Sequence, residues 1–401
     1  MANVSSSNGL EKRPKLRFPG FDEPYKQCRI GDIYAERSQR GASNMELLSV
    51  TMNDGVKPRS EIEGKDNSSE DKSNYKIVRK GDMVYNSMRM WQGANGISPC
   101  DGIVSPAYTV LMPKQEINNG YFAALFKSAN MINEFRKNSQ GMTSDTWNLK
   151  YPQIETIKVQ IPSVSEQDKV SEMFSVLDER IAAQSRLVES LKKYKRGVVR
   201  TLLSPKHCSI KNVKWTTSRI GDIGTFIKGA PLSKADISLE GTPFILYGEL
   251  YTTYSEVISN VVRKTQASAD KQYYSQIGDV IIPTSGETPE EISTASCVML
   301  SDIILAGDLN IYRCTQVDGR IMSYILNHVV NERIARIAQG KSIVHVQAAE
   351  ISKIEITYPD PFSQKTIIAI LAAISDRIDQ SNAELRLLHE LRKALLQKLF
   401  I

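Results

Sequence analysis

Two short stretches of the chain carry residue types that could act on phosphate groups. Gly340-Lys-Ser would complete a phosphate-binding loop only if a glycine lay five residues earlier, and that position is Ala335. A Pro-Asp nuclease motif needs a downstream acidic-x-Lys triplet, but the candidate after Pro359 is Glu-Leu-Arg at 384–386. We therefore expect no nucleotide hydrolysis and no nuclease chemistry from these residues.

Motifs for methyl transfer, nucleophilic catalysis and metal binding are also missing. The Asn/Asp-Pro-Pro-Tyr/Phe loop of an amino-methyltransferase is matched by neither 105–108 nor 360–362, and no Gly-x-Ser-x-Gly elbow occurs. His207 and Cys208 are neighbours without further ligands nearby, which is typical of a linker pair. The cysteines form no C-x-x-C motif, so neither a disulfide framework nor a zinc site is predicted; they are Cys28, Cys100, Cys208, Cys297 and Cys314. We expect no catalytic residue, no metal and no cofactor in this chain.

Composition indicates an ordinary globular protein of more than one domain. The chain has 401 residues, 41% of them hydrophobic and 24% charged. No apolar run is long enough to cross a bilayer, so we expect a cytoplasmic protein without a membrane partner. A net charge of +6 permits nucleic-acid binding without requiring it.

Two long helical segments repeat along the chain. Pro359 lies 197 residues after Pro162, and at this offset residues 161–203 align with 358–400 without a gap. Apolar residues recur at alternating spacings of four and three, which is typical of a coiled-coil seam. Polar interruptions coincide, Gln184 with Ser381 and Lys195 with Arg392. The central seam positions are Phe174, Leu177, Ile181, Gln184, Val188 and Leu191 in the first helix, and Leu371, Ile374, Ile378, Ser381, Leu385 and Leu388 in the second.

The repeat extends upstream of both helices. "RIGDI" opens each globular stretch, at 29–33 and 219–223. Gly-Asp turns at 81–82 and 278–279 each precede a strand-like run. One helical segment follows in each half, roughly 119–137 and 318–337. We therefore predict a disordered tail (1–14), a first globular domain (15–162), a first spacer helix (163–205), a second globular domain (206–359) and a second spacer helix (360–401).

The predicted fold class is α+β, with two similar globular domains about a pseudo-two-fold axis. If that axis crosses the helices, they form an antiparallel coiled coil that holds the two domains apart. The 32 residues from Val170 to Leu202 would then span about 48 Å, at about 1.5 Å per residue. Two diverged domains at a fixed separation are suited to recognising two different DNA half-sites on either side of an unread gap.

This layout resembles the specificity subunit of type I restriction–modification systems over nearly the whole chain. The resemblance rests on "PKLRFPGF" (14–21), the two "RIGDI" openings, the helix starts at 167–170 and 363–366, and five segments of the second half. These are "GTFIKGAPLSKADI", "PFILYGELYTTY", "GDVIIPTSGETPEEI", "GDLNIYR" and "IAQGKSIVHVQ".

The resemblance implies two target-recognition domains that each read one part of a split site on double-stranded DNA. It implies a helical spacer that sets the gap and docks two methyltransferase subunits. Restriction and translocase subunits would complete the complex. Adenine methylation with S-adenosylmethionine, and cleavage driven by ATP and magnesium, would then belong to those partner chains.

Candidate DNA contacts lie in three loops of each half. Arg, Lys, Asn and Gln side chains can reach base edges, while Lys, Arg and backbone N–H groups bind phosphates. The first half offers Arg37, Gln39, Arg40, Arg89, Trp91, Gln92, Arg136, Lys137, Gln140 and Thr143. The second half offers Lys228, Lys234, Thr284, Ser285, Gln339, Lys341, Ser342 and His345. The alternative for each residue is a solvated loop or, for Trp91, a packing role.

Two other function classes remain open from the sequence. A coiled-coil scaffold for protein partners would use the helices and would show no sequence-selective DNA binding. An enzyme would require an unrecognised site, and loop substitutions would then change turnover rather than the DNA target.

Overall fold

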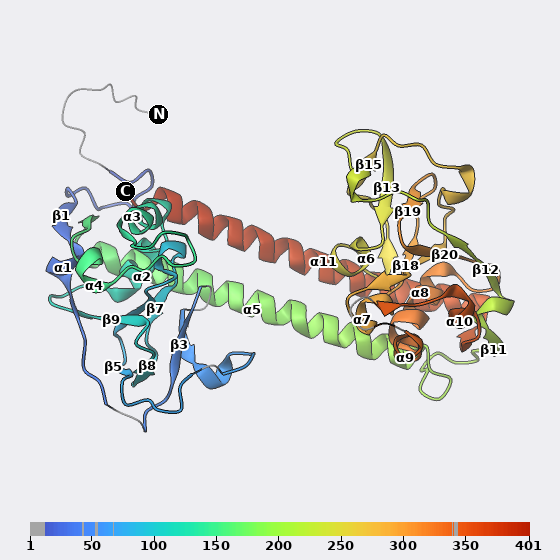
Figure 1. Ribbon diagram of the computed structural model, residues 1–401, viewed down its shortest axis with the longest axis horizontal. Coiled ribbons are helices and arrows are strands. Elements are labelled where there is room, and N and C mark those ends of the chain that lie inside the picture. Colours follow the sequence, from blue (N-terminus) through green and yellow to red (C-terminus); the bar gives the residue numbers. More distant parts are fainter. Residues whose placement is uncertain (1–12, 42–43, 53–54, 67, 339, 341–343) are drawn as a thin grey trace. The chain divides into compact units, whose positions relative to one another are not determined.

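The computed structural model describes residues 13–41, 44–52, 55–66, 68–338, 340 and 344–401. The chain divides into two compact units (Figure 1). The first unit comprises residues 1–185 and 383–401, and the second comprises residues 186–382. Each long helix therefore contributes one part of its length to each unit.

The first unit builds its core on a four-stranded sheet of order β2-β9-β6-β7. Its pairs are antiparallel. Its elements before the long helix are β1 (Lys26–Arg29), α1 (Ile30–Ile33), β2 (Tyr34–Glu36), β3 (Leu48–Thr51), β4 (Gly55–Pro58), 3-10 helix η1 (Arg59–Glu61), β5 (Lys76–Val78), β6 (Met83–Asn86), 3-10 helix η2 (Met90–Gln92), β7 (Asn95–Ile97), β8 (Gly102–Val104), β9 (Tyr108–Pro113), α2 (Asn119–Leu125), α3 (Ala129–Asn138), α4 (Tyr151–Ile154) and β10 (Lys158–Ile161).

The second unit builds its core on a five-stranded sheet of order β12-β20-β16-β18-β14. Its elements between the long helices are β11 (Trp215–Arg219), η3 (Ile220–Asp222), β12 (Gly224–Lys228), η4 (Lys234–Asp236), β13 (Thr242–Leu246), α6 (Glu249–Thr252), β14 (Val257–Ile258), β15 (Arg263–Thr265), η5 (Lys271–Tyr273), β16 (Asp279–Pro283), β17 (Ser285–Gly286), α7 (Pro289–Ile292), β18 (Ser296–Val298), β19 (Ile304–Ala306), β20 (Leu309–Cys314), α8 (Gly319–His328), α9 (Asn331–Ile337), β21 (Val344–His345), α10 (Ala348–Ser352) and β22 (Glu355–Pro359).

The predicted α+β class and the internal repeat are confirmed. The same hydrogen bonds recur 197 residues apart: Leu149 N donates to Ser87 O at 2.8 Å, and Val346 N donates to Thr284 O at 3.0 Å. A glutamine near the start of each long helix accepts a bond from the residue that caps the mid-domain helix. Asn118 N donates to Gln167 Oε1 and Asp318 N donates to Gln364 Oε1.

The two Gly-Asp pairs form equivalent turns. Gly81 and Gly278 have φ values of +90° and +95°, which favour glycine. The carboxylate of Asp82 accepts from Arg79 N at 2.8 Å, and that of Asp279 accepts from Gln276 N at the same distance. Each aspartate therefore closes the turn before a core strand, as the sequence predicts.

The single mid-domain helix predicted in each half is instead two helices. In the first unit α2 ends at Leu125 and α3 begins at Ala129, because Ser128 adopts an extended backbone and its hydroxyl caps Met131 N. In the second unit α8 and α9 are separated by the β-branched pair Val329 and Val330.

The two long helices are α5 (Val164–Leu202) and α11 (Pro361–Lys398) (Figure 1). Every predicted seam position is buried or half-buried. In the first unit Phe174 stacks on Phe400 with ring centroids 6.0 Å apart, and Asp178 pairs with Arg392. Along α5 the contacts of Phe174, Asp178 and Arg180 are made with Phe400, Arg392 and Glu384 in turn. Because the partner number falls as the α5 number rises, the helices pair antiparallel there, as predicted. In the second unit the seam joins one core cluster, with members Val199, Leu202, Ile367 and Leu371.

A buried ion-pair network joins α5 to the sheet of the second unit. Lys195 Nζ lies 2.7 Å from Glu256 Oε2, and His328 Nε2 lies 2.7 Å from Glu256 Oε1. Burial would raise the pKa of Glu256, but the hydrogen bond from His328 and the charge of Lys195 outweigh it and lower the pKa to about 2. Lys195 is therefore a polar seam residue with a partner outside the coiled coil.

The N-terminal segment of the first unit packs against the end of α11. Leu16 N donates to Lys398 O at 2.9 Å, and Phe18 packs on the cluster that holds Leu399 and Phe400. Arg17 pairs with the buried carboxylate of Glu166 at 2.8 Å. The segment before β1 is therefore fixed by both long helices.

Candidate nucleic-acid interface

The predicted loops of the first unit leave the sheet at one end. β2 and β6 are both antiparallel to β9, so they run parallel to each other. Their carboxyl ends meet near the start of β9, where Arg37 N donates to Val110 O and Ser87 N donates to Ala107 O. We call this side of the first unit its loop end.

The first of these loops is held mainly by its own domain. Arg37 forms a two-bond pair with Asp82, at 2.7 and 3.0 Å, so its guanidinium is committed to the Gly-Asp turn. Gln39 O accepts from Ile77 N, and Arg40 bonds to Asn74. The side chains of Gln39 and Arg40 are exposed, whereas Arg37 is half-buried. Gln39 and Arg40 therefore remain available at the surface, and Arg37 positions the loop.

The second and third loops of the first unit meet in an aromatic and cationic cluster. The rings of Trp91 and Trp147 are 5.1 Å apart and nearly perpendicular. The guanidinium of Arg136, from α3, lies 5.6 Å from the centre of the Trp91 ring. Arg89, two residues before Trp91 in the same loop, is exposed. We call Trp91, Trp147, Arg136 and Arg89 the tryptophan cluster.

The other predicted residues of this end lie around that cluster. Gln140 pairs through its backbone with Asn148, at 3.0 and 2.8 Å, which closes the third loop. The side chains of Gln140, Lys137 and Thr143 are exposed, and Lys137 pairs with Glu134 at 2.7 Å. Gln92 is half-buried in η2. The loop end thus presents amide and cationic groups around two aromatic rings.

The second unit has the same topology at its own loop end. β12 and β16 are both antiparallel to β20, so Lys228 and Thr284 emerge near its start. The third loop returns here because Ser285 pairs with His345 in the β17–β21 ladder. Lys228 and His345 are exposed, and Thr284 is half-buried.

The remaining predictions in the second unit differ in position. Ser285 is buried and its hydroxyl donates to Asp308 at 2.8 Å, so it anchors the loop. Lys234 is exposed but sits in η4, which Ser233 and Asp236 cap. The predicted contacts Gln339, Lys341 and Ser342 lie outside the described residues. The structure therefore groups Lys228, Thr284 and His345, whereas Lys234 lies six residues beyond Lys228 in η4.

Trp147 is a member of the tryptophan cluster that sequence reasoning missed. Trp147 follows the polar run "GMTSDT" in a short loop, where an aromatic residue has no strand or helix periodicity to explain it. An isolated tryptophan in a polar loop is the signal that would have pointed to it.

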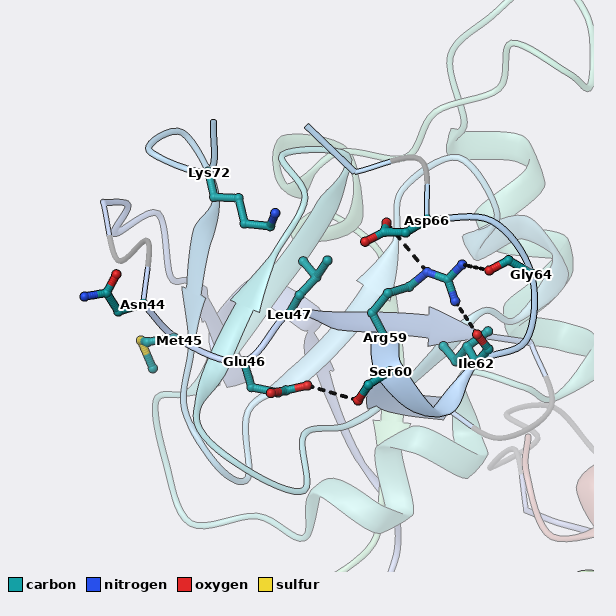
Figure 2. Close-up of a pocket in the computed structure, with 10 residues that line it drawn as sticks. All are labelled: Asn44, Met45, Glu46, Leu47, Arg59, Ser60, Ile62, Gly64, Asp66 and Lys72. Atoms are coloured by element: carbon teal, nitrogen blue, oxygen red, sulfur yellow. Dashed lines mark hydrogen bonds and ion pairs between the residues drawn. The ribbon is translucent and has the colours of Figure 1, made fainter. Parts of the chain in front are cut away.

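The cavity in Figure 2 lies between residues 44–47, which precede β3, and residues 59–72, which connect β4 to β5. It has a volume of about 560 Å³, and Figure 2 shows Arg59 at its wall bonded to the carbonyls of Ile62 and Gly64. Lys72, also at the wall, donates to Ser69 O at 3.1 Å. These two cations are therefore bonded to backbone carbonyls of the β4–β5 connection.

Potential metal ligands are dispersed over the described part of the chain. Among the described residues, no group of three or more His, Cys, Asp or Glu side chains could hold a metal ion. Burial raises the pKa of the Cys297 thiol to about 12, which keeps it protonated and unreactive. No helix in the described part of the chain is long and apolar enough to cross a membrane.

Comparisons with known proteins identify the repeated unit. The model of the type I restriction modification DNA specificity domain matches the chain twice, at residues 23–193 and 212–389. The crystal structure of a type I restriction–modification S subunit from M. genitalium is similar, with a TM-score of 0.61 and 15% identity, over 97% of this chain and 99% of that one.

A second solved structure is described as the basis of complex assembly and conformational transition of a type I restriction–modification system. It has a TM-score of 0.59 and 13% identity, over 95% of this chain and 98% of that one. No curated protein sequence matches the chain. At these identities the two structures support a shared fold, and the twice-matched domain defines the family.

Proposed function

Since the chain belongs to the type I restriction modification DNA specificity family, we propose that it is the non-catalytic subunit that reads the DNA target of a type I complex. Each unit reads one half of a split, asymmetric site. The observation that carries this proposal is that the two units share a backbone framework but differ in the side chains of their loops. The bonds from Leu149 to Ser87 and from Val346 to Thr284 are equivalent, yet the loops that they fix carry different side chains.

The two loop ends are suited to different DNA sequences. The first unit offers two tryptophans with Arg89 and Arg136, which can stack on bases and donate to guanine edges. The second offers Lys228, Thr284 and His345, which donate and accept single hydrogen bonds. Two identical ends would read a palindrome, whereas these ends favour an asymmetric site.

The long helices serve as the spacer between half-sites in this proposal. The 39 residues of α5 extend about 58 Å at about 1.5 Å per residue. A continuous helix with a buried seam resists bending, so it supports a fixed unread gap between the two half-sites. S-adenosylmethionine, ATP and magnesium would act in partner chains, as would methylation and cleavage.

Exposed apolar side chains on the helices support docking of two methyltransferase subunits. In the first unit Leu387 and Leu391 of α11 are 64% and 49% exposed, one helical turn apart. In the second unit Tyr194 of α5, which aligns with Leu391 in the repeat, is 61% exposed, and Leu187 lies two turns before it. One apolar face on each helix, sharing the aligned positions Tyr194 and Leu391, matches two copies of one partner, and restriction subunits would join that assembly.

Replacing Leu387 and Leu391 together with glutamate should remove one docking face. We expect the complex to fall from two methyltransferase subunits per chain to one, with at least tenfold weaker binding of the lost copy. Mass measurement of the purified complex checks this. The control, Leu239→Glu, changes a still more exposed leucine away from the helices and should keep both copies. Two bound copies in the double variant would contradict the docking proposal.

The main proposal is tested by mapping adenine methylation across the source genome with and without this gene. We expect a split motif with a fixed unread gap to lose its methyl mark when the gene is deleted. If every methylated motif persists, purified chain is tested for selective DNA binding at two salt concentrations. Absence of selectivity there would favour the alternative, a coiled-coil scaffold for proteins.

A further inference from the structure

One stretch of the second unit is strongly basic and contains no acidic residue. Between Ser190 and Gly221 the chain has no aspartate or glutamate. It carries Lys192, Lys193, Lys195, Arg196, Arg200, Lys206, Lys211, Lys214 and Arg219. The other long helix has no counterpart. At the 197-residue offset, Lys192, Arg196 and Arg200 align with His389, Lys393 and Gln397 of α11. An acid, Glu390, also lies among these α11 residues.

Three of these cations form a row on α5. Lys192, Arg196 and Arg200 are spaced by four residues, which places them along one face of the helix. All three are exposed. Within the described residues their side chains form no ion pair, in contrast to the buried Lys195. We call these three residues the basic row.

The basic row leads to a cavity of about 430 Å³ with further positive charge. Arg200 and Arg333 line the cavity together with His328, which bonds to Glu256. Its buried apolar wall is formed by Leu203, Val330 and Ile356. The acid at the rim is Glu355, whose backbone oxygen accepts from Arg333 at 3.1 Å. Cations therefore outnumber acids around the opening.

Helix α9 connects this cavity with the loop end of the second unit. It begins beside the cavity at Asn331 and ends at Ile337, where the third predicted DNA-contact loop starts. Arg333 and Arg336 are exposed along it, and Glu332 lies 3.7 Å from Arg336. The positive surface thus continues from α5 through Arg333 toward the residues proposed to read DNA.

We propose that the basic row and Arg333 bind the DNA phosphate backbone next to the half-site read by the second unit. This inference rests on the proposed function. Exposed lysine and arginine side chains bind phosphates independently of sequence and release counterions. The side chains would hold the unread DNA against the helix and add affinity without changing the recognised bases.

The row is better suited to DNA than to an acidic protein partner. A protein interface needs an apolar centre, and the exposed apolar residue nearby, Tyr194, lies about 200° around the helix from Lys192. The apolar docking face and the basic row therefore occupy different sides of α5. One helix can bind a methyltransferase subunit on one side and DNA on the other.

The test compares the full chain with the triple variant Lys192→Ala, Arg196→Ala, Arg200→Ala on two duplexes. One duplex carries the split motif found by methylation mapping, and the other has random sequence. Affinity is measured over a series of salt concentrations. Each lost phosphate contact should reduce the slope of log K against log salt by about 0.9, so a total reduction of about two to three is expected on both duplexes. Preference for the motif should not change.

The matched control is the variant Lys264→Ala, Lys271→Ala, Lys353→Ala, which loses the same charge from exposed positions elsewhere in the second unit. An equal loss of slope in both variants, or an unchanged slope in the first, overturns the inference. Unchanged DNA binding with loss of the methyltransferase subunit also overturns it. If the unmodified chain shows no preference for the motif, the proposed function fails, while the slope on random DNA still decides the role of the row.

Discussion

Glu256→Gln is expected to destabilise the second unit by about 3 kcal/mol. The substitution preserves shape but leaves Lys195 charged in the seam, where both it and Glu256 are shielded from water. Lys195 also lies 5.4 Å from the ring centre of Tyr324, which cannot replace a carboxylate. Chemical denaturation followed by tryptophan fluorescence and circular dichroism measures the loss.

The repeat offers a matched control for this prediction. Lys195 aligns with Arg392, whose partner Asp178 is about half exposed, with the closest atoms 2.5 Å apart. Asp178→Asn should therefore cost less than about 1 kcal/mol. Adding Lys195→Met to Glu256→Gln should recover part of the lost stability, because it removes the uncompensated charge. Equal losses for the two single variants would contradict the argument.

The same network predicts a defined pH dependence. The pKa of Glu256 is about 2 in the folded protein, below its ordinary value of 4.5. A lowered pKa gives stability that is fully present above pH 4.5 and is lost as the pH falls toward 2. The difference in unfolding free energy between the wild type and Glu256→Gln should therefore shrink over this interval. A constant difference from pH 6 to pH 3 would argue against a carboxylate role.

Arg136→Ala and Trp91→Ala are each expected to weaken binding to the split motif by roughly 10- to 100-fold, because each removes a contact that contributes about 1–3 kcal/mol to binding. The guanidinium of Arg136 covers the Trp91 ring, and Trp147 packs against the same ring. Loss of either residue should affect only the half-site read by the first unit. Binding to motifs altered one base at a time measures which half loses selectivity.

A control and a rescue make this second prediction specific. Lys158→Ala removes an exposed cation from β10, which pairs with β1 away from the loop end, and it should leave selectivity intact. Trp91→Phe should retain more affinity than Trp91→Ala, because it keeps an aromatic face. Equal loss of selectivity at both half-sites would show that the cluster acts through overall folding rather than through contact with one half-site.

Periodic features were predictable from the sequence because they depend on local spacing. The long helices, their seam and the 197-residue offset follow from apolar residues at regular intervals, such as Phe174, Leu177 and Ile181. The Gly-Asp turns were also predictable, since glycine at positive φ followed by a capping aspartate is a local motif.

Features that depend on contacts distant in sequence were not predictable. The partner of Lys195 lies 61 residues away, and three strands and two helices separate Trp91 from Trp147 along the chain. The sequence also could not separate Arg37, which is committed to Asp82, from Gln39 and Arg40, which stay exposed. Loop residues of the same type differ in role because their neighbours come from other strands.

The contact between Leu16 and Lys398 has a consequence for how such a gene could be arranged. In the second unit the chain runs without a break from the end of α5 at Leu202, through residues 203–214, into β11. In the first unit the equivalent junction, from the end of α11 to the segment before β1, is made by a hydrogen bond and apolar packing instead of a peptide bond. The same junction is therefore covalent in the second unit and non-covalent in the first. A circular permutant that joins the present termini and opens the chain between Pro205 and Asn212 would keep the same set of packed elements.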